Sequence, residues 1–208
     1  MVRHGESEAN RNNIFAGHFD ADLQNRGLIQ AQKTAEYIKN NYKVDRVYSS
    51  DLKRAYKTGK CIADCLGVGI EKTEKLREIK AGKWDGLYYY SLENEFREEF
   101  NLWLNDIGNS ACPGGESVKE LSERIMRELT RIAEENHDKA VVVATHATPI
   151  RAAQTLIQFG TLDEMKNVNW VSNASVTVLE YNDKNWECKK VSIDEHLNEL
   201  KTSLPSNV

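Results

Sequence analysis

The sequence predicts an α/β protein, a three-layer α/β/α sandwich whose mostly parallel central sheet carries helices on both faces. Short apolar segments of strand length alternate with longer amphipathic segments along the 208 residues. Parallel strands need crossovers of this kind, and crossovers that are helical cover the sheet. Residues 140–145 are almost wholly apolar, which is typical of a strand buried on both faces. A chain of this length can build one large core, so we expect residues 1–208 to form a single domain.

The first half of the chain is predicted to contain a loop followed by two helices, each with its strand. Residues 10–22 have the composition of a loop, and apolar residues recur at helical spacing over residues 25–40. Short strands are expected at residues 46–49 and 70–73. The helix between them presents one apolar face, formed by Leu52, Ala55, Gly59, Ile62 and Leu66.

The middle of the chain departs from this alternation. We expect a helical excursion from the sheet near residues 88–112. Residues 91–104 place an apolar face opposite an acidic one; the apolar residues are Leu92, Phe96, Phe100 and Trp103, and the acidic residues are Glu93, Glu95, Glu98 and Glu99. Such a segment either covers a site or packs on the core with a solvated acidic side.

The second half begins with a turn at Pro113-Gly114-Gly115. Ser117 and Glu120 form a capping box, which predicts that a helix begins there and runs through residue 136. Thr148 and Pro149 have the pattern of an N-cap followed by proline at the first helical position. The last elements are predicted strands at residues 175–181 and 186–193, before an irregular tail after Lys201.

Composition excludes several classes of protein. The net charge is −4, whereas a broad nucleic-acid surface needs an excess of Lys and Arg. No apolar run approaches the length of a membrane span, and no signal peptide precedes the first motif. The four cysteines show no disulfide framework. We therefore expect a cytoplasmic protein that binds neither nucleic acid nor a membrane.

Chemistry-bearing residues stand where several predicted strands end. Arg3, His4 and Gly5 follow the first residues of the chain, Arg54 follows the strand at residues 46–49, and His146 follows residues 140–145. Because ligands in open α/β sheets gather beyond the carboxyl ends of parallel strands, these side chains should converge. Arginine offers a planar fork of donors for a phosphoryl group, and histidine offers a nucleophilic nitrogen near neutral pH.

Five motifs in order resemble the histidine phosphatase superfamily, the phosphoglycerate-mutase-like enzymes. The motifs are Val2-Arg3-His4-Gly5, Ser49-Ser50-Asp51-Leu52-Lys53-Arg54-Ala55, Leu76-Arg77-Glu78-Ile79, Pro113-Gly114-Gly115-Glu116-Ser117 and Ala144-Thr145-His146-Ala147. Each motif alone is weakly specific, but five motifs in this order and at plausible spacings are together a specific signal. The short segment between Glu78 and Pro113 resembles the phosphatase branch.

The resemblance implies a metal-independent phosphomonoesterase of the histidine acid phosphatase type, without a cofactor. His4 would attack phosphorus and form a phosphohistidine, and Glu78 would protonate the departing oxygen and later activate water. The implied catalytic residues are His4, Glu78, His146, Arg3 and Arg54. The implied substrate-binding residues are Arg3, Asn10, Gly17, Arg54, His146 and Ala147.

This sequence departs from the family pattern at three places. Ala147 stands where glycine usually follows the second histidine, and residues 20–24 lack the usual proline and threonine. The hydrophobic strand that leads into Arg3 is reduced to Met1 and Val2, so we expect a shortened first strand. None of these changes removes a catalytic group.

Other functions remain open at this point. A 2,3-bisphosphoglycerate-dependent mutase would share the mechanism, and a phosphate-binding regulatory module is suggested by Ala147. A metallohydrolase would use His4, His18 and His146, but their spacing is not that of metal ligands, and neighbouring arginines would repel a cation. The expected partner is a small phosphorylated metabolite, and the expected state is a monomer or homodimer. Tyr88, Tyr89 and Tyr90 are candidates for stacking on a ring in the substrate.

Overall fold

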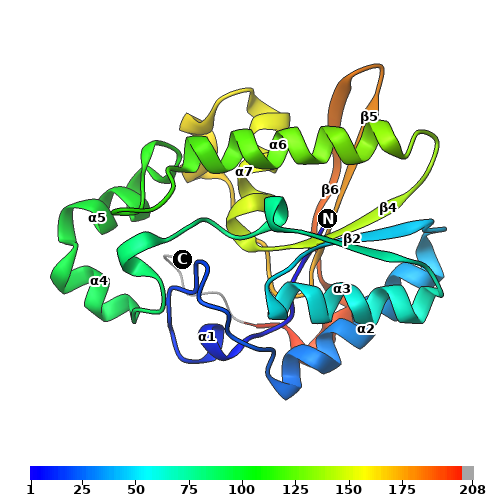
Figure 1. The fold of residues 1–208 in the computed structure, drawn as a ribbon, viewed down its shortest axis with the longest axis horizontal. Coiled ribbons are helices and arrows are strands. Elements are labelled where there is room, and N and C mark those ends of the chain that lie inside the picture. Colours follow the sequence, from blue (N-terminus) through cyan, green and yellow to red (C-terminus); the bar gives the residue numbers. More distant parts are fainter. Residues whose placement is uncertain (203–208) are drawn as a thin grey trace.

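A six-stranded sheet with strand order β3-β2-β4-β1-β5-β6 forms the centre of the computed structural model, which describes residues 1–202. Helices lie on both sides of this sheet (Figure 1). Neighbouring strands are parallel from β3 to β1, whereas β5 is antiparallel to both of its neighbours. The strands are β1 (Val2–Arg3), β2 (Arg46–Ser50), β3 (Ile70–Thr73), β4 (Val141–Thr145), β5 (Val176–Asn182) and β6 (Asn185–Ile193). The predicted three-layer, mostly parallel sandwich is therefore confirmed.

Two pairs of long helices cover the two faces. Helices α2 (Asn25–Asn41) and α3 (Lys53–Leu66) lie on one face, and α6 (Val118–Glu135) and α7 (Ala147–Phe159) lie on the other (Figure 1). Successive residues of a strand point to opposite faces. Val47 accordingly packs in the core beneath α2 and α3, whereas its neighbour Tyr48 packs in the core beneath α6 and α7.

Strand β1 has only two residues, as expected, yet it lies inside the sheet between β4 and β5. Val2 is in register with Ala144 of β4 and with Val176 of β5. The backbone N–H of His4 donates to the carbonyl of Thr145 at 3.0 Å. This short strand is thus long enough to fix Arg3 and His4 at the carboxyl edge of the parallel strands.

The middle segment contains two helices, α4 (Tyr89–Glu95) and α5 (Arg97–Asn105), which lie beside the sheet (Figure 1). The prediction of one apolar helical face over residues 91–104 is wrong in one respect: the segment forms two helices, because the backbone at Phe96 is not helical (φ −131°, ψ 42°). Phe100 and Trp103 are buried, and the acidic residues of the segment are exposed. Trp103 packs in the core and also lines the cavity described below.

The two predicted helix starts had different outcomes. Ser117 and Glu120 form the capping box of α6, as predicted. Helix α7, however, begins at Ala147 with His146 as its N-cap, so the prediction of Thr148 as N-cap and Pro149 as first helical residue is wrong. The acceptor at this helix end is a distant side chain, because the backbone N–H of Thr148 donates to Oε2 of Glu78 at 3.3 Å. A local cap pattern cannot reveal such a partner.

Shorter elements join these parts. The expected loop at residues 10–22 overlaps a short helix, α1 (Glu8–Arg11), whose N-cap is Ser7. The 3-10 helices are η1 (Glu74–Leu76), η2 (Gly82–Trp84), η3 (Ile107–Asn109), η4 (Leu162–Asn167) and η5 (Glu195–Leu200). The irregular tail expected after Lys201 falls mostly on residues 203–208, which lie outside the described residues. Among residues 1–202, no helix is both long and apolar enough to cross a membrane.

Candidate active site

The carboxyl ends of β1, β2 and β4 meet at a cavity of about 140 Å³. Seven of the eight predicted site residues line it: Arg3, His4, Asn10, Gly17, Arg54, Glu78 and Ala147. The eighth, His146, lies against His4, with the two ring centroids 5.2 Å apart. The structure therefore brings together residues as distant in the chain as Arg3 and Ala147, which are 144 positions apart.

His4 is a buried, neutral imidazole. Its Nδ1 lies 2.7 Å from the carbonyl oxygen of Gly5. A carbonyl oxygen can only accept a hydrogen bond, so Nδ1 carries the proton and Nε2 keeps its lone pair. Burial, together with the positive charges of Arg54 and Arg3, holds the pKa of His4 well below its usual 6.5. The histidine is thus held in the form that a nucleophile requires.

The glycine after His4 is required by packing. A Cβ at Gly5 would lie 2.3 Å from the carbonyl oxygen of Gly27 at the start of α2. Any side chain would therefore force α2 away from the end of β1. The backbone of Gly5, whose carbonyl sets the His4 tautomer, is fixed by a hydrogen bond from its N–H to Oγ1 of Thr58 at 3.1 Å.

His146 is also buried and neutral. Its Nε2 lies 2.8 Å from Oγ of Ser50, and its Nδ1 is buried without a partner in residues 1–202. Burial, followed by the charge of Arg54 and by His4, keeps the pKa of His146 well below 6.5. One ring nitrogen is thus left for a group that the protein itself does not supply.

Arg3 and Arg54 are buried cations that form no ion pair with a carboxylate within residues 1–202. Arg3 donates to the carbonyl of Val171, and Arg54 donates to the carbonyls of Gly17 at 2.8 Å and Phe19 at 3.0 Å. Burial lowers the pKa of each guanidinium to about 10, so both remain charged at neutral pH. The Nε atom of each is buried and unpartnered. Two buried guanidinium groups with no carboxylate at ion-pair distance in the described residues favour the binding of an anion, although the charge of Glu78 also acts on both.

Three predicted binding residues contribute in different ways. Oδ1 of Asn10 accepts from the backbone and hydroxyl of Ser7 and from Nδ2 of Asn173, so only its amide nitrogen remains for a ligand. Gly17 has φ +47°, and its carbonyl orients Arg54. Ala147 is the first residue of α7 and is absent from the residues with positive φ in the described chain. Alanine therefore replaces the usual glycine without backbone strain.

The Glu78 carboxylate is held between two backbone amides. Oε1 accepts from the N–H of Ile79 at 2.8 Å, and Oε2 accepts from the N–H of Thr148 at 3.3 Å. The second amide belongs to the first turn of α7, whose N-terminus also contributes Ala147 to the cavity. The carboxylate is thus directed toward the same place as Arg3 and His4.

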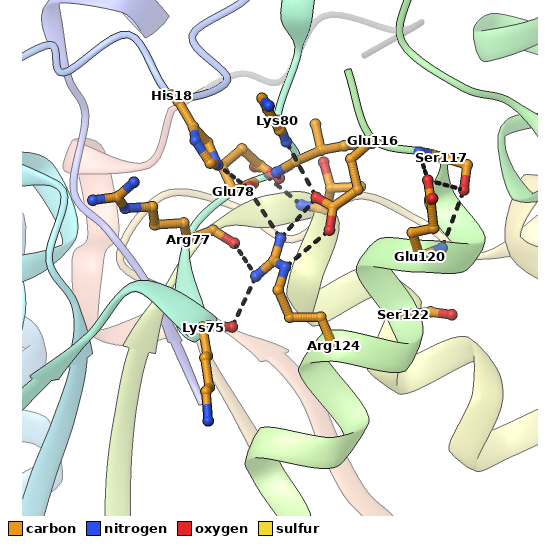
Figure 2. A network of polar contacts seen from close by, with 12 residues as sticks. His18, Lys75, Arg77, Glu78, Lys80, Glu116, Ser117, Glu120, Ser122 and Arg124 are labelled. Atoms are coloured by element: carbon orange, nitrogen blue, oxygen red, sulfur yellow. Dashed lines mark hydrogen bonds and ion pairs between the residues drawn. The ribbon is translucent and has the colours of Figure 1, made fainter. Parts of the chain in front are cut away.

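A polar network fixes the backbone that carries Glu78 (Figure 2). Arg124 donates to the carbonyls of Lys75, Arg77 and Glu78 at 2.8, 3.1 and 3.3 Å. Its guanidinium also forms a bidentate pair with Glu116, with both distances 2.9 Å. The Glu116 side chain in turn accepts from the backbone N–H of Lys80 at 3.2 Å. The motif Pro113-Gly114-Gly115-Glu116-Ser117 thus supports the acid through Arg124.

His18 lies outside the cavity of His4. Its Nε2 is 2.9 Å from the carbonyl oxygen of Glu78, and Figure 2 shows it at the edge of the Arg124 network. Within residues 1–202, no group of three or more His, Cys, Asp or Glu side chains is arranged to hold a metal ion. The arrangement of His4, His18 and His146 that a metallohydrolase would need is therefore not formed by the described residues.

Sequence reasoning missed much of the cavity wall. The additional lining residues include Glu6, Phe15, Trp103, Trp170, Asn173 and Thr202. Of the three tyrosines that were candidates for stacking, Tyr89 lines the cavity and Tyr88 and Tyr90 do not. Trp103 had a sequence signal, because it stands on the predicted apolar face of residues 91–104. Trp170 and Thr202 carry no local pattern, and only the return of the chain across the sheet brings them to the site.

The fold and the site together define an α/β protein whose cavity is lined by Arg3, His4 and Arg54, with His146 packed against His4. The chain belongs to the histidine phosphatase superfamily (branch 1), whose sequence model matches residues 1–194.

Relatives and solved structures agree with this assignment. Phosphoserine phosphatase 1 of Hydrogenobacter thermophilus is 30% identical over 200 residues, which cover 96% of this chain and 94% of that protein. The metal-independent phosphoserine phosphatase of Arabidopsis thaliana is 31% identical over 202 residues, covering 96% and 83% respectively. The structure of Bacillus stearothermophilus YhfR superposes with a TM-score of 0.90 at 20% identity, covering 95% of this chain and 97% of that one, and so supports the fold.

Proposed function

We propose that this protein is a metal-independent phosphomonoesterase that hydrolyses a small organic phosphate through a phosphohistidine on His4. The observation that carries the proposal is the pairing of a neutral His4, whose Nε2 keeps a lone pair, with two buried arginines that have no carboxylate partner in the described chain. A phosphoryl group would supply the missing negative charge and an electrophilic phosphorus atom.

The first half-reaction transfers the phosphoryl group to the protein. Nε2 of His4 forms a bond to phosphorus while the bond to the ester oxygen breaks, and Glu78 gives that oxygen a proton. Arg3, Arg54 and His146 bind the phosphoryl oxygens through the transfer, with Asn10, Gly17 and the N-terminus at Ala147 shaping the pocket. In the second half-reaction, Glu78 takes a proton from water, the water oxygen attacks phosphorus, and the bond to His4 breaks.

Two further observations support this proposal. The cavity of about 140 Å³ suits a small substrate, since pockets for drug-sized ligands are usually about 300–1,000 Å³. Two of the relatives described above are named phosphoserine phosphatases, one of them metal-independent.

Release of inorganic phosphate from p-nitrophenyl phosphate in the presence of EDTA tests the reaction. Rapid acid or base quench during turnover of ³²P-labelled substrate should reveal label that is acid-labile and base-stable. In Glu78→Gln the label should still form with this leaving group, which needs little protonation, but should be hydrolysed about 10² to 10⁴ times more slowly.

Other outcomes identify the competing functions. Activity that disappears with EDTA and returns with a divalent ion would contradict metal independence. Transfer of the label from the protein to added phosphoglycerate, without release of free phosphate, would indicate a mutase. Binding of vanadate without any turnover would indicate the regulatory module.

A further inference from the structure

Four aromatic side chains form one continuous wall of the cavity. Phe15, Tyr89, Trp103 and Trp170 all line it. Phe15 lies 5.9 Å from Tyr89 and 5.2 Å from Trp103 between ring centroids, and Trp103 lies 6.4 Å from Trp170. These residues come from the first loop, from α4 and α5, and from the segment before β5. We refer to these four side chains as the aromatic wall.

The aromatic wall is rigid before any ligand binds. Phe15 and Trp103 are only 5% and 3% exposed. Trp170 is held by the guanidinium of Arg151, whose Cζ lies 4.2 Å from the ring centroid. Arg151 is itself fixed by the carbonyls of Val168 and Met165, both at 2.7 Å. A wall that is already ordered loses little entropy when it binds a ligand.

The indole nitrogen of Trp103 is an unsatisfied polar group in this wall. Nε1 is buried and has no hydrogen-bond partner in residues 1–202. A buried indole N–H usually finds an acceptor. Nε1 of Trp84, in the core, is buried without a partner in the described residues in the same way, so this nitrogen does not by itself point to a ligand.

The charges of the cavity restrict what that ligand can be. Among the described lining residues, the only lysine or arginine side chains are Arg3 and Arg54, and the proposed function assigns both to the phosphoryl group. The lining carboxylates are Glu6 and Glu78. A substrate that carried a carboxylate beside its phosphate would bring that charge into the cavity with no cation to pair with it.

We propose that the cavity selects phosphomonoesters whose alcohol portion is compact, uncharged and planar or apolar, and that it disfavours esters with a carboxylate, such as phosphoserine. This inference rests on the proposed function. The ammonium group of phosphoserine can pair with Glu6, but its carboxylate remains unpaired. The preference would distinguish this protein from the relatives that are named phosphoserine phosphatases.

Comparison of benzyl phosphate, ethyl phosphate and O-phospho-L-serine tests the inference. All three release an alkyl oxygen, so differences in kcat/KM report mainly on recognition of the alcohol. We expect kcat/KM for benzyl phosphate to exceed that for ethyl phosphate by about tenfold, which is the usual value of one good aromatic contact. We expect kcat/KM for phosphoserine to be lower than that for ethyl phosphate. Phosphoserine that equals or exceeds benzyl phosphate would overturn the inference and leave the proposed function intact. No hydrolysis of any of the three esters or of p-nitrophenyl phosphate would contradict the proposed function itself.

Variants assign the preference to particular side chains. Trp170→Leu should raise KM for benzyl phosphate several-fold and leave ethyl phosphate nearly unchanged. The matched control is Trp186→Leu in β6, because Trp186 is partly buried against Tyr181 and does not line the cavity. Glu6→Gln should raise kcat/KM for 2-phosphoglycolate, which carries a carboxylate and no ammonium, relative to ethyl phosphate by removing a repelling charge.

Two results would show that the aromatic wall is only structural. One is an equal loss of kcat/KM for benzyl phosphate and for ethyl phosphate in Trp170→Leu, with an unchanged circular dichroism spectrum. The other is the same equal loss in Tyr89→Leu, which carries the test should Trp170→Leu fail to fold.

Discussion

Two cavities lie on either side of the segment that carries Glu78, and both are rich in arginine. Glu78 lines the cavity of His4, whereas its neighbours Arg77 and Lys80 line a second cavity together with Arg124. The positive residues of the second cavity would by themselves make it a candidate for the anion site.

The partners of the arginines distinguish the two cavities. Arg77 forms a bidentate pair with Asp51, and Arg124 forms one with Glu116. Arg3 and Arg54 are instead oriented by backbone carbonyls, which fix a guanidinium without neutralising its charge. The arginines of the two cavities therefore differ in whether a carboxylate neutralises them, and this difference favours the cavity of His4 as the anion site.

The largest expected effect contrasts the histidines of the two cavities. His4→Ala should lower kcat by at least about 10⁴-fold and abolish the phosphoprotein label, since loss of a nucleophile removes the whole covalent route. His18→Ala, which removes a contact to the Glu78 carbonyl, should retain the label and most of the activity. Rapid-quench labelling and steady-state rates of the two variants measure this. Label that persists in His4→Ala would assign the nucleophile elsewhere, with His146 the next candidate.

The next effect contrasts the arginines directly. Arg54→Gln should lower kcat/KM by about 10²- to 10³-fold, the usual cost of losing one stabilising donor in a transition state, and should weaken inhibition by vanadate. Arg77→Gln should change activity much less, because the charge of Arg77 is already balanced by Asp51. Steady-state kinetics and vanadate titration of both variants provide the measurement. Equal losses in the two variants would contradict the distinction between paired and unpaired arginines.

A smaller effect should follow from loosening the support of Glu78. Arg124→Gln breaks the contacts to three carbonyls and to Glu116, so the acid should be less well placed. We expect about a tenfold loss of kcat for benzyl phosphate and a smaller loss for p-nitrophenyl phosphate, because only the alkyl leaving group depends on protonation.

Arg131→Gln is the control for this experiment. Arg131 lies on the same helix and pairs with Glu128 and Glu135, and it donates no hydrogen bond to the backbone of Glu78 in the described residues. An Arg124→Gln loss that is the same for both substrates would mean that Arg124 supports the fold and does not position the acid.

The smallest expected effect is on stability and its pH dependence. The pKa of buried His146 is lowered, so below pH 6.5 the unfolded chain takes up a proton that the folded protein does not. The free energy of unfolding should therefore fall as the pH drops through this range, by at most about 1.4 kcal/mol per histidine between pH 7.5 and 5.5. In urea unfolding over the same pH range, the free energy of unfolding of His146→Gln should fall less than that of the wild type, and the difference should be about the contribution of one histidine.

His137→Gln is the matched control, because His137 is exposed and its loss removes an imidazole from the unfolded chain as well. An identical pH dependence in His146→Gln and the wild type would mean that His146 does not resist protonation in the folded protein.

Much of this protein was determined by its sequence alone. The alternation of strands and helices specified the layered sheet, because periodicity and chain connectivity are local properties. Arg3, His4, Arg54 and His146 were predicted from the resemblance of their motifs to the family. Their convergence was predicted because each follows a strand, and the carboxyl ends of parallel strands meet at one edge. Even the two-residue strand before Arg3 sufficed, because its pairing with β4 fixes its place.

Only the tertiary structure decided which charged groups are neutralised and what surrounds the substrate. Nothing near Arg77 or Arg124 in the chain shows that one meets Asp51 or that the other holds the backbone of Glu78. The start of α7 was mistaken because its N-terminal amide is capped by Glu78, 70 residues away. Trp170 likewise reaches the cavity only through the fold. Pairing, capping and lining are long-range contacts, and their free energies depend on distance in space, which local sequence patterns do not encode.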